Sequence, residues 1–239
     1  SPAGHQPMHS PSGRYVMVFN GEIYNHLEMR RQLEAGADGS ASPAWRGRSD
    51  TETLLAGFDA WGIAPALART VGMFAFAVWD RHSGALTLGR DRIGEKPLYY
   101  GWQGRGSGAV FLFGSELKAL RAHPAFESDI DRDALCLQMR YSYIPAPHSI
   151  YRGIAKLPPG CLLTVSARTR EPRLTSYWSG PHQVAAGVAA PFAGSAEQAV
   201  EALDTLLREA VQAQMIADVP LGAFLSGGVD SSTVVALMQ

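Results

Sequence analysis

A glycine-containing loop near the end of the chain lies between an apolar segment and a helical one. Residues 219–225 (VPLGAFL) predict a short strand, residues 226–232 (SGGVDSS) a loop, and residues 233–239 the start of a helix. A strand–loop–helix unit is typical of an α/β domain, but a parallel sheet needs crossover connections and further strands. We therefore expect residues 195–239 to hold only the beginning of such a domain.

The chemistry of this loop favours phosphate binding. Its glycines let backbone N–H groups approach phosphate oxygens, and the N-terminus of the following helix attracts an anion. Asp230 is a candidate ligand for a magnesium ion. The loop lacks the lysine of a Walker A motif. By itself the pattern also fits a plain strand-to-helix turn with serine caps.

The rest of the chain predicts a different architecture. Residues 14–20 predict a strand, and residues 73–79 with 85–89 and 97–102 with 109–113 predict two hairpins. Helices are expected at 25–34 and, after a Ser-x-x-Glu capping box that starts at Ser49, up to Trp61. Antiparallel strands with helices early in the chain indicate a layered α+β domain.

Further along, a helix is expected at 131–140, a strand at 161–165 and an amphipathic helix within 195–217. Between these parts, residues 180–194 (GPHQVAAGVAAPFAG) are nearly free of charge and rich in Ala, Gly and Pro. This composition predicts a linker. We expect a first domain over 1–179, the linker over 180–194, and a second domain that begins at 195.

A second candidate site lies at the end of the first predicted strand, at Asn20, Gly21 and Glu22. An Asn amide and a Gly backbone N–H can stabilise an oxyanion, and a carboxylate can hold a substrate ammonium group. Asn-Gly is also the commonest tight-turn pair, so taken alone the pattern favours a turn without function. Asp50 is ambiguous too, because a carboxylate in the first turn of a helix is favoured by the helix dipole.

Composition excludes several classes of function. The formal net charge of -1 and the pI near 6.6 give no basic footprint for nucleic acid or anionic lipid. No apolar run reaches the roughly 18 to 20 residues that cross a bilayer, so we expect a cytoplasmic protein without membrane contact. Cys136 and Cys161 are expected to be buried thiols, and neither the cysteines nor the seven histidines have metal-ligand spacing.

Taken together, eight segments resemble one family, the asparagine synthetases and related class II glutamine amidotransferases. In order along the chain they are GHQPM (4–8), FNGEIYNH (19–26), RSDTE (48–52), GMFAFAVWD (72–80), GRDRIGEKPLYY (89–100), GSELKAL (114–120), KLPPG (156–160) and DVPLGAFLSGGVDSS (218–232). The resemblance implies an N-terminal-nucleophile hydrolase-type αββα sandwich, here incomplete, followed by the start of an α/β pyrophosphatase-loop ATP domain.

The resemblance also implies a reaction. Glutamine hydrolysis through a cysteine thioester would release ammonia, which would displace AMP from an adenylated aspartate to give asparagine, glutamate, AMP and pyrophosphate. The implied ligands are glutamine, ATP with Mg2+, and aspartate or another carboxylate acceptor, with no prosthetic group. A homodimer of the full-length parent is a further implication.

Individual roles follow by motif. Asn20 and Gly21 would form the oxyanion hole, and Asn20, Glu22 and Asp50 would bind glutamine. Asp230 would hold the metal ion. The residues expected to bind ATP are Leu225, beside the adenine, and Ser226, Gly227, Gly228, Asp230, Ser231 and Ser232, around the pyrophosphate.

Other family features have no counterpart in this sequence. The nucleophilic cysteine and the arginine that clamps the glutamine carboxylate precede GHQPM in the family, and Ser1 is not expected to replace the cysteine. We therefore expect this polypeptide as given to be inactive. Two alternatives stay open: an amidotransferase that acts on a sugar acid in surface-polysaccharide synthesis, and a degenerate module that has kept the fold without catalysis.

Overall fold

The structure, a computed structural model, describes residues 4–36, 43–166, 169–217 and 219–239. Ser1 lies outside these ranges. The chain divides into two compact units, residues 1–180 and 181–239, which are described separately.

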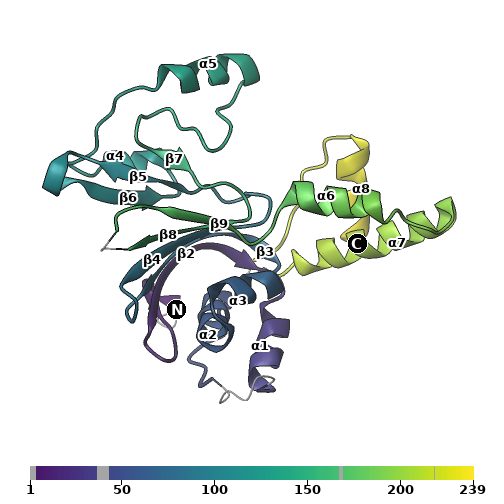
Figure 1. The fold of residues 1–239 in the computed structure, drawn as a ribbon. Helices are drawn as coiled ribbons and strands as arrows, with labels where there is room; N and C mark the ends of the chain where they lie inside the picture. The colour runs from purple at the N-terminus through teal and green to yellow at the C-terminus, as the bar shows by residue number, and fades with distance from the viewer. Residues whose placement is uncertain (1–3, 37–42, 167–168, 218) are drawn as a thin grey trace. The chain divides into compact units, whose positions relative to one another are not determined.

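Two antiparallel sheets form the centre of the first unit (Figure 1). The larger has the order β1-β2-β3-β4-β8-β9 and the smaller the order β6-β5-β7. The strands of the larger sheet are β1 (Met8–His9), β2 (Tyr15–Ile23), β3 (Gly72–Asp80), β4 (Ala85–Arg90), β8 (Cys161–Ser166) and β9 (Arg173–Ser176). Those of the smaller sheet are β5 (Tyr99–Gln103), β6 (Val110–Gly114) and β7 (Ala155–Lys156).

Three helices cover the outer face of the larger sheet: α1 (His26–Glu34), α2 (Asp50–Trp61) and α3 (Ile63–Arg69). The short helix α4 (Leu117–Arg121) follows β6, with a 3-10 turn, η2 (Gly106–Gly108), between β5 and β6. Helix α5 (Arg132–Tyr141) is capped by Asp131, whose carboxylate accepts the N–H groups of Asp133 and Ala134.

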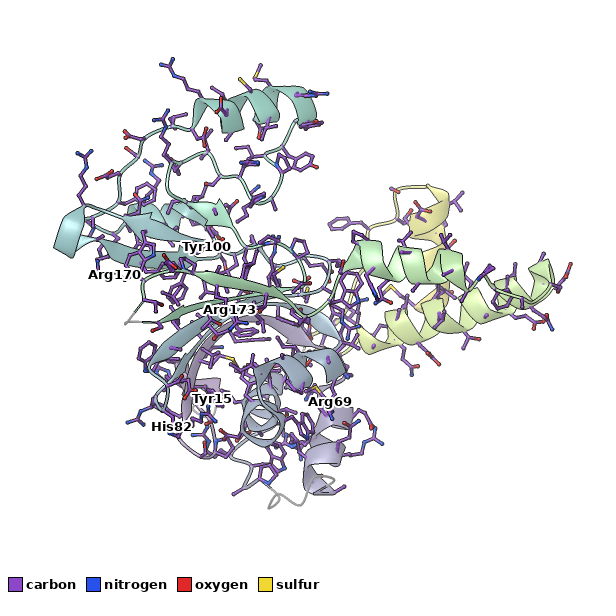
Figure 2. The ribbon with its side chains drawn as sticks, viewed as in Figure 1. Tyr15, Arg69, His82, Tyr100, Arg170 and Arg173 are labelled. Carbon is purple, nitrogen blue, oxygen red and sulfur yellow. The ribbon has the colours of Figure 1, made fainter. Side chains whose placement is uncertain are left out.

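The alternation of side chains along β3 divides the core into two layers. Phe74, Phe76 and Val78 pack in the cluster that includes helices α1 to α3, whereas Ala75 and Ala77 pack in the cluster that includes the smaller sheet. Tyr15 belongs to the first cluster and Tyr100 packs against the second (Figure 2). Small residues on one face of β3 and large ones on the other let two sheets and a helical layer pack on a single strand.

Most elements expected in the first unit are present. The strand at 14–20, both hairpins, the helices at 25–34 and 131–140 and the strand at 161–165 are confirmed within a few residues. The capping box is confirmed in part. The Ser49 hydroxyl accepts the N–H of Glu52 at 3.2 Å, but the Glu52 carboxylate accepts the N–H groups of Arg46 and Gly47.

The cysteine prediction is half wrong. Cys161 is buried, and burial raises the pKa of its thiol, whereas Cys136 is exposed. Cys136 lies on α5, which buries its residue Ala134 and presents Met139 with 81% of its surface exposed. Amphipathic spacing predicts a helix here, but it does not tell how much of that helix another layer covers.

The second unit contains α7 (Ala196–Ala213) and α8 (Val229–Leu237), and α6 (Gly180–Ala189) spans the junction of the units. Helix α6 therefore occupies residues whose composition predicts a linker. The expected boundaries at 179 and 195 stay predictions. Among the described residues, no helix combines the length and the apolar character needed to cross a membrane.

Two local predictions in the second unit are wrong. Residues 219–225 form no strand, because a strand is held by hydrogen bonds to a neighbour and the described part of this unit contains no other strand. Helix α8 starts at Val229 instead of residue 233. Its first turn includes Asp230, whose carboxylate is favoured by the helix dipole.

A buried carboxylate holds the turn that follows β4. Asp91 is completely buried and accepts the N–H groups of Gly94, Glu95 and Lys96 at 2.6, 2.9 and 2.9 Å. It also accepts the N–H of Phe74, on β3, at 3.2 Å. The charged run at 90–96 is therefore fixed to the larger sheet, although its composition alone suggests a solvated turn.

We expect Asp91→Asn to lower the free energy of unfolding by about 3 kcal/mol. The amide keeps only one acceptor oxygen, and its NH2 group would face backbone N–H donors that the carboxylate now accepts. Urea unfolding followed by tryptophan fluorescence measures this change, since all five tryptophans lie before residue 181. Asp129→Asn, at an exposed position, is the matched control. Equal unfolding midpoints for the two variants would refute the structural role of Asp91.

Candidate active site at the edge of β2

The backbone of β2 presents alternate N–H groups to its two sides. Tyr24 donates to Val71 O at 2.9 Å, and Arg81 donates to Arg14 O at 3.0 Å, so the even-numbered residues of β2 form the hydrogen-bonded pairs with β3. Gly21 faces Phe74 in a pair without such bonds. Its N–H therefore points away from β3, as do those of the other odd-numbered residues.

Most of these outward N–H groups have acceptors. Tyr15 donates to Ser10 Oγ, and Met17 pairs with Met8 of β1. Phe19 donates to Gln6 Oε1 at 2.7 Å, and Ile23 donates to Asp50 Oδ2 at 2.9 Å. These four contacts account for the outward N–H groups of β2 at residues 15, 17, 19 and 23, so only that of Gly21 remains.

The N–H of Gly21 has no acceptor among residues 4–36, 43–166, 169–217 and 219–239. The group lies between two satisfied neighbours on the same edge. A backbone donor left free in this way is available to an external acceptor. The predicted oxyanion donor is thus an N–H without an acceptor in the described part of the chain.

Close packing of β2 on β3 explains why position 21 is glycine. A Cβ atom at Gly21 would lie 2.2 Å from Met73 O and 2.6 Å from Phe74 Cα. A Cβ atom at Gly72 would lie 2.2 Å from Glu22 O. The tight-turn interpretation of Asn20-Gly21 is wrong, because β2 continues through both residues to Ile23.

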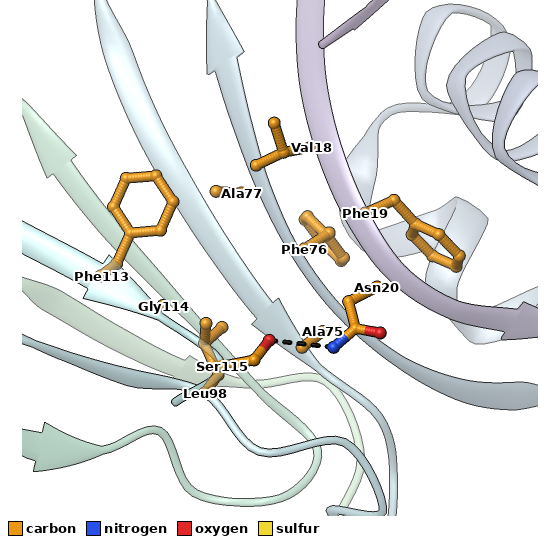
Figure 3. A pocket seen from close by; sticks show the side chains of 10 residues that line it. All are labelled: Val18, Phe19, Asn20, Ala75, Phe76, Ala77, Leu98, Phe113, Gly114 and Ser115. Carbon is orange, nitrogen blue, oxygen red and sulfur yellow. Dashed lines mark hydrogen bonds between the residues drawn. The ribbon is translucent and has the colours of Figure 1, made fainter. Parts of the chain in front are cut away.

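The Asn20 side chain lies in a cleft between the two sheets (Figure 3). The cleft has a volume of about 210 Å³ and is otherwise lined mainly by apolar side chains of β2, β3 and the end of β6. Asn20 Nδ2 donates to Ser115 Oγ at 3.0 Å. Because an amide nitrogen carries two hydrogens, this bond orients the amide and leaves a second donor.

Two carboxylates lie near the same end of β2. Asp50 begins α2 and is tied to the strand through the N–H of Ile23, while its other oxygen accepts the N–H of Thr51. Glu22 follows Gly21 directly. Burial raises the pKa of Tyr24 to about 12, and the charges of Glu95 and Glu22 add to this rise. The structure therefore brings Asn20, Gly21, Glu22 and Asp50 together.

Three residues that the sequence did not single out belong to this neighbourhood. Gln6 accepts the backbone N–H of Phe19, and Ser115 accepts a hydrogen bond from the Asn20 side chain. The Nδ1 atom of His26 is buried without a hydrogen-bond partner in the described part of the chain. Burial lowers the pKa of His26, and the charge of Asp50 opposes that shift. Only contacts across long sequence separations reveal these residues.

The second predicted site, the loop at 226–232, is exposed. Ser226 Oγ and Ser231 Oγ are 2.9 Å apart, and Gly227 has a φ of +82°, a conformation that glycine adopts readily. Gly228, the N-cap residue of α8, provides no side-chain cap, so the N–H groups of the first turn are available to an anion. No group of three metal-ligating side chains occurs among the described residues, so Asp230 stands as a single carboxylate.

Leu225 is 63% exposed. A nearby cleft of about 330 Å³ in the second unit is lined by other residues: Val211, Gln214, Met215, Leu221, Gly222, Ala223, Val234 and Met238. Leu225 is therefore next to the loop but not in this cleft.

Comparison with known families agrees with the placement of the two sites in different units. The glutamine amidotransferase domain matches residues 1–178, and the asparagine synthase domain matches residues 202–239. The chain belongs to the glutamine amidotransferase family.

Relatives of this chain include a protein of Mycobacterium tuberculosis that is 37% identical over 238 residues, which are 98% of this chain and 35% of that protein. Asparagine synthetase [glutamine-hydrolyzing] 3 of Bacillus subtilis is 33% identical over 237 residues, which are 98% of this chain and 36% of that protein. The chain thus spans about a third of the length of these relatives.

A solved structure described as the allosteric regulatory enzyme of purine biosynthesis superposes with a TM-score of 0.51 at 20% identity, over 73% of this chain and 32% of the other. With the two antiparallel sheets, this similarity confirms the predicted N-terminal-nucleophile hydrolase-type fold.

Replacing Gly21 by Ala should force β2 and β3 apart and lower the free energy of unfolding by about 3 kcal/mol, the upper range for overpacking. Urea unfolding with tryptophan fluorescence is the measurement. Gly4→Ala has open space around the added methyl group and should change stability by less than about 0.5 kcal/mol. A Gly21→Ala protein as stable as Gly4→Ala would show that the strands are not in close contact.

Proposed function

We propose that this chain belongs to a cytoplasmic glutamine-dependent asparagine synthetase. In this proposal, glutamine hydrolysis in the first unit supplies ammonia to an aspartate adenylate, and the products are asparagine, glutamate, AMP and pyrophosphate. The observation that carries the proposal is the free N–H of Gly21 beside the Asn20 amide. The asparagine synthase match at 202–239 supports the ATP-dependent half.

The glutaminase step needs charge stabilisation at one oxygen. When a thiolate attacks the glutamine carboxamide, its electron pair forms the new C–S bond and the carbonyl pair moves to the oxygen. The Gly21 N–H and the second Asn20 Nδ2 hydrogen would donate to that oxyanion. Collapse of the tetrahedral species, with the proton that the thiol lost now on the departing nitrogen, expels ammonia and leaves a thioester. Water then cleaves the C–S bond to give glutamate and the free thiol. By family resemblance, the thiol would be that of a cysteine that precedes the GHQPM motif.

Substrate orientation would come from the two carboxylates. Glu22 is adjacent to the oxyanion donor, and Asp50 is fixed to the same strand end by the Ile23 N–H. Both are suited to the α-ammonium group of glutamine. Because this contact exists equally in the bound substrate and in the transition state, it contributes to affinity more than to turnover.

The ATP site would be built on the second loop. Its free N–H groups and serine hydroxyls suit the pyrophosphate of ATP, and Gly227 and Gly228 let the backbone approach it. Mg2+ usually combines one or two carboxylates with phosphate oxygens and water, so the single carboxylate of Asp230 fits this role. The ion would neutralise the departing pyrophosphate.

The glutaminase proposal is tested in the longest natural polypeptide that contains this sequence. Asn20→Ala should lower kcat for glutamate release about 100-fold, as the loss of an oxyanion donor does elsewhere. Glu22→Gln should raise KM for glutamine about tenfold with a smaller change in kcat. Asn25→Ala is the matched control, because the Asn25 amide bonds only to the backbone at Arg69 and Val71 among the described residues. Wild-type kcat in Asn20→Ala would refute the oxyanion assignment.

The synthetase half is tested by product analysis with aspartate and Mg-ATP. We expect AMP and pyrophosphate to form in equal amounts with asparagine. Asp230→Asn should reduce this synthesis at least about tenfold through loss of a metal ligand, while glutamate release from glutamine continues. Synthesis at the wild-type rate in Asp230→Asn, or amidation of a uronic acid instead of aspartate, would contradict this half of the proposal.

A further inference from the structure

We infer that Gln6 is a positioning residue for the oxyanion donor, an inference that rests on the proposed glutaminase function. Gln6 does not line the cleft, and within the described residues it forms no hydrogen bond with Asn20. Its half-buried side chain instead accepts the N–H of Phe19, two residues before Gly21. It acts on the donor through the strand.

The register of β1 explains why a side chain performs this task. Met8 is opposite Met17 and His9 is opposite Val16, so the same register places residue 6 opposite Phe19. Strand β1 begins at Met8, however, and no backbone carbonyl of the described residues accepts the N–H of Phe19. The Gln6 Oε1 atom supplies the missing acceptor at 2.7 Å and extends the ladder by one bond without extending the strand.

The use of a side-chain acceptor in place of a backbone carbonyl shapes the donor site at Gly21. A regular continuation of β1 would bring residue 4 opposite Gly21 and would cover its N–H. Because the ladder ends in a side chain at Phe19 and resumes with Asp50 at Ile23, the edge is clamped on both sides of Gly21 while Gly21 itself stays open. Successive outward N–H groups on a strand are about 7 Å apart, which leaves space for one small acceptor between the clamps.

The clamps matter because an oxyanion donor works only at the correct position. The donor must lie within about 3 Å of the developing charge, and small displacements of catalytic groups have large effects on rate. Gly21 is already held from one side by its packing on Met73 and Phe74. Gln6 restrains Phe19, two residues before Gly21, and Asp50 restrains Ile23, two residues after it. Loss of Gln6 would free the N–H of Phe19 and relax the edge.

A matched pair of variants separates positioning from stability. Gln6→Met keeps the size of the side chain and removes the acceptor. Gln103→Met removes an equivalent bond elsewhere, because Gln103 Oε1 accepts the N–H of Glu127 at 2.8 Å and its amide donates to Arg152 O. Gln103 is on β5 and 4% exposed, so its loss should destabilise the fold at least as much.

Both variants are assayed for glutamate release in the longest natural polypeptide that contains this sequence. We expect Gln6→Met to lower kcat about tenfold with KM for glutamine unchanged within about twofold, because an oxyanion forms only after binding. Gln103→Met should keep the wild-type kcat at a temperature where both proteins are folded.

Each other outcome overturns a defined claim. An unchanged kcat in Gln6→Met, or an equal loss of kcat in Gln103→Met, overturns the positioning role and leaves the proposed function intact. A rise in KM alone would assign Gln6 to substrate binding and also overturn it. If the wild-type protein releases no glutamate from glutamine, the proposed function fails, and the role of Gln6 fails with it.

Discussion

The alternation of backbone hydrogen bonds along β2 is the constraint on which the candidate active site depends. Pairing with β3 uses the even-numbered residues and directs every odd-numbered N–H to the opposite edge. A shift of one residue in this register would exchange the two sets and direct the Gly21 N–H into the sheet. The core fixes the register, because Met17 and Ile23 are fully buried beneath the helices.

The same register sets the surroundings of the site. Gly21 and Gly72 lack the Cβ atoms that would separate β2 from β3, so the two backbones approach closely where the donor is exposed. Asp91 binds the N–H of Phe74 from the other side of β3. A rigid strand pair, fixed at both edges by side chains, therefore supports a group whose function requires a constant position.

Sequence patterns predicted the local elements well and the long-range contacts poorly. Apolar runs and turn residues located β2, β3, β4 and β8 of the larger sheet but not its outer strands β1 and β9, and the Ser49 cap located α2. The continuation of β2 through Asn20 and Gly21 was not predictable, since the pair is typical of a turn and its partners lie about fifty residues away on β3. The strand expected at 219–225 failed for a related reason: its hydrogen bonds require neighbours that no local pattern supplies.

For the site itself, the family resemblance pointed to Asn20, Gly21, Glu22 and Asp50, and the fold brings them together. Gln6 and Ser115 escaped prediction because their contacts join residues 13 and 95 positions apart. Nothing in the residue types alone marks either as part of a site. Their roles follow only from which N–H groups are bonded and which are free.

Amide hydrogen exchange on the unmodified chain tests this central claim directly. The N–H groups of Phe19, Gly21 and Ile23 lie on one edge of one strand, and exchange followed by NMR measures each of them separately. We predict that Gly21 exchanges at least about tenfold faster than both neighbours, because their N–H groups are bonded whereas its own has no acceptor among the residues that the structure describes. Protection of Gly21 equal to that of Phe19 and Ile23 would contradict the account.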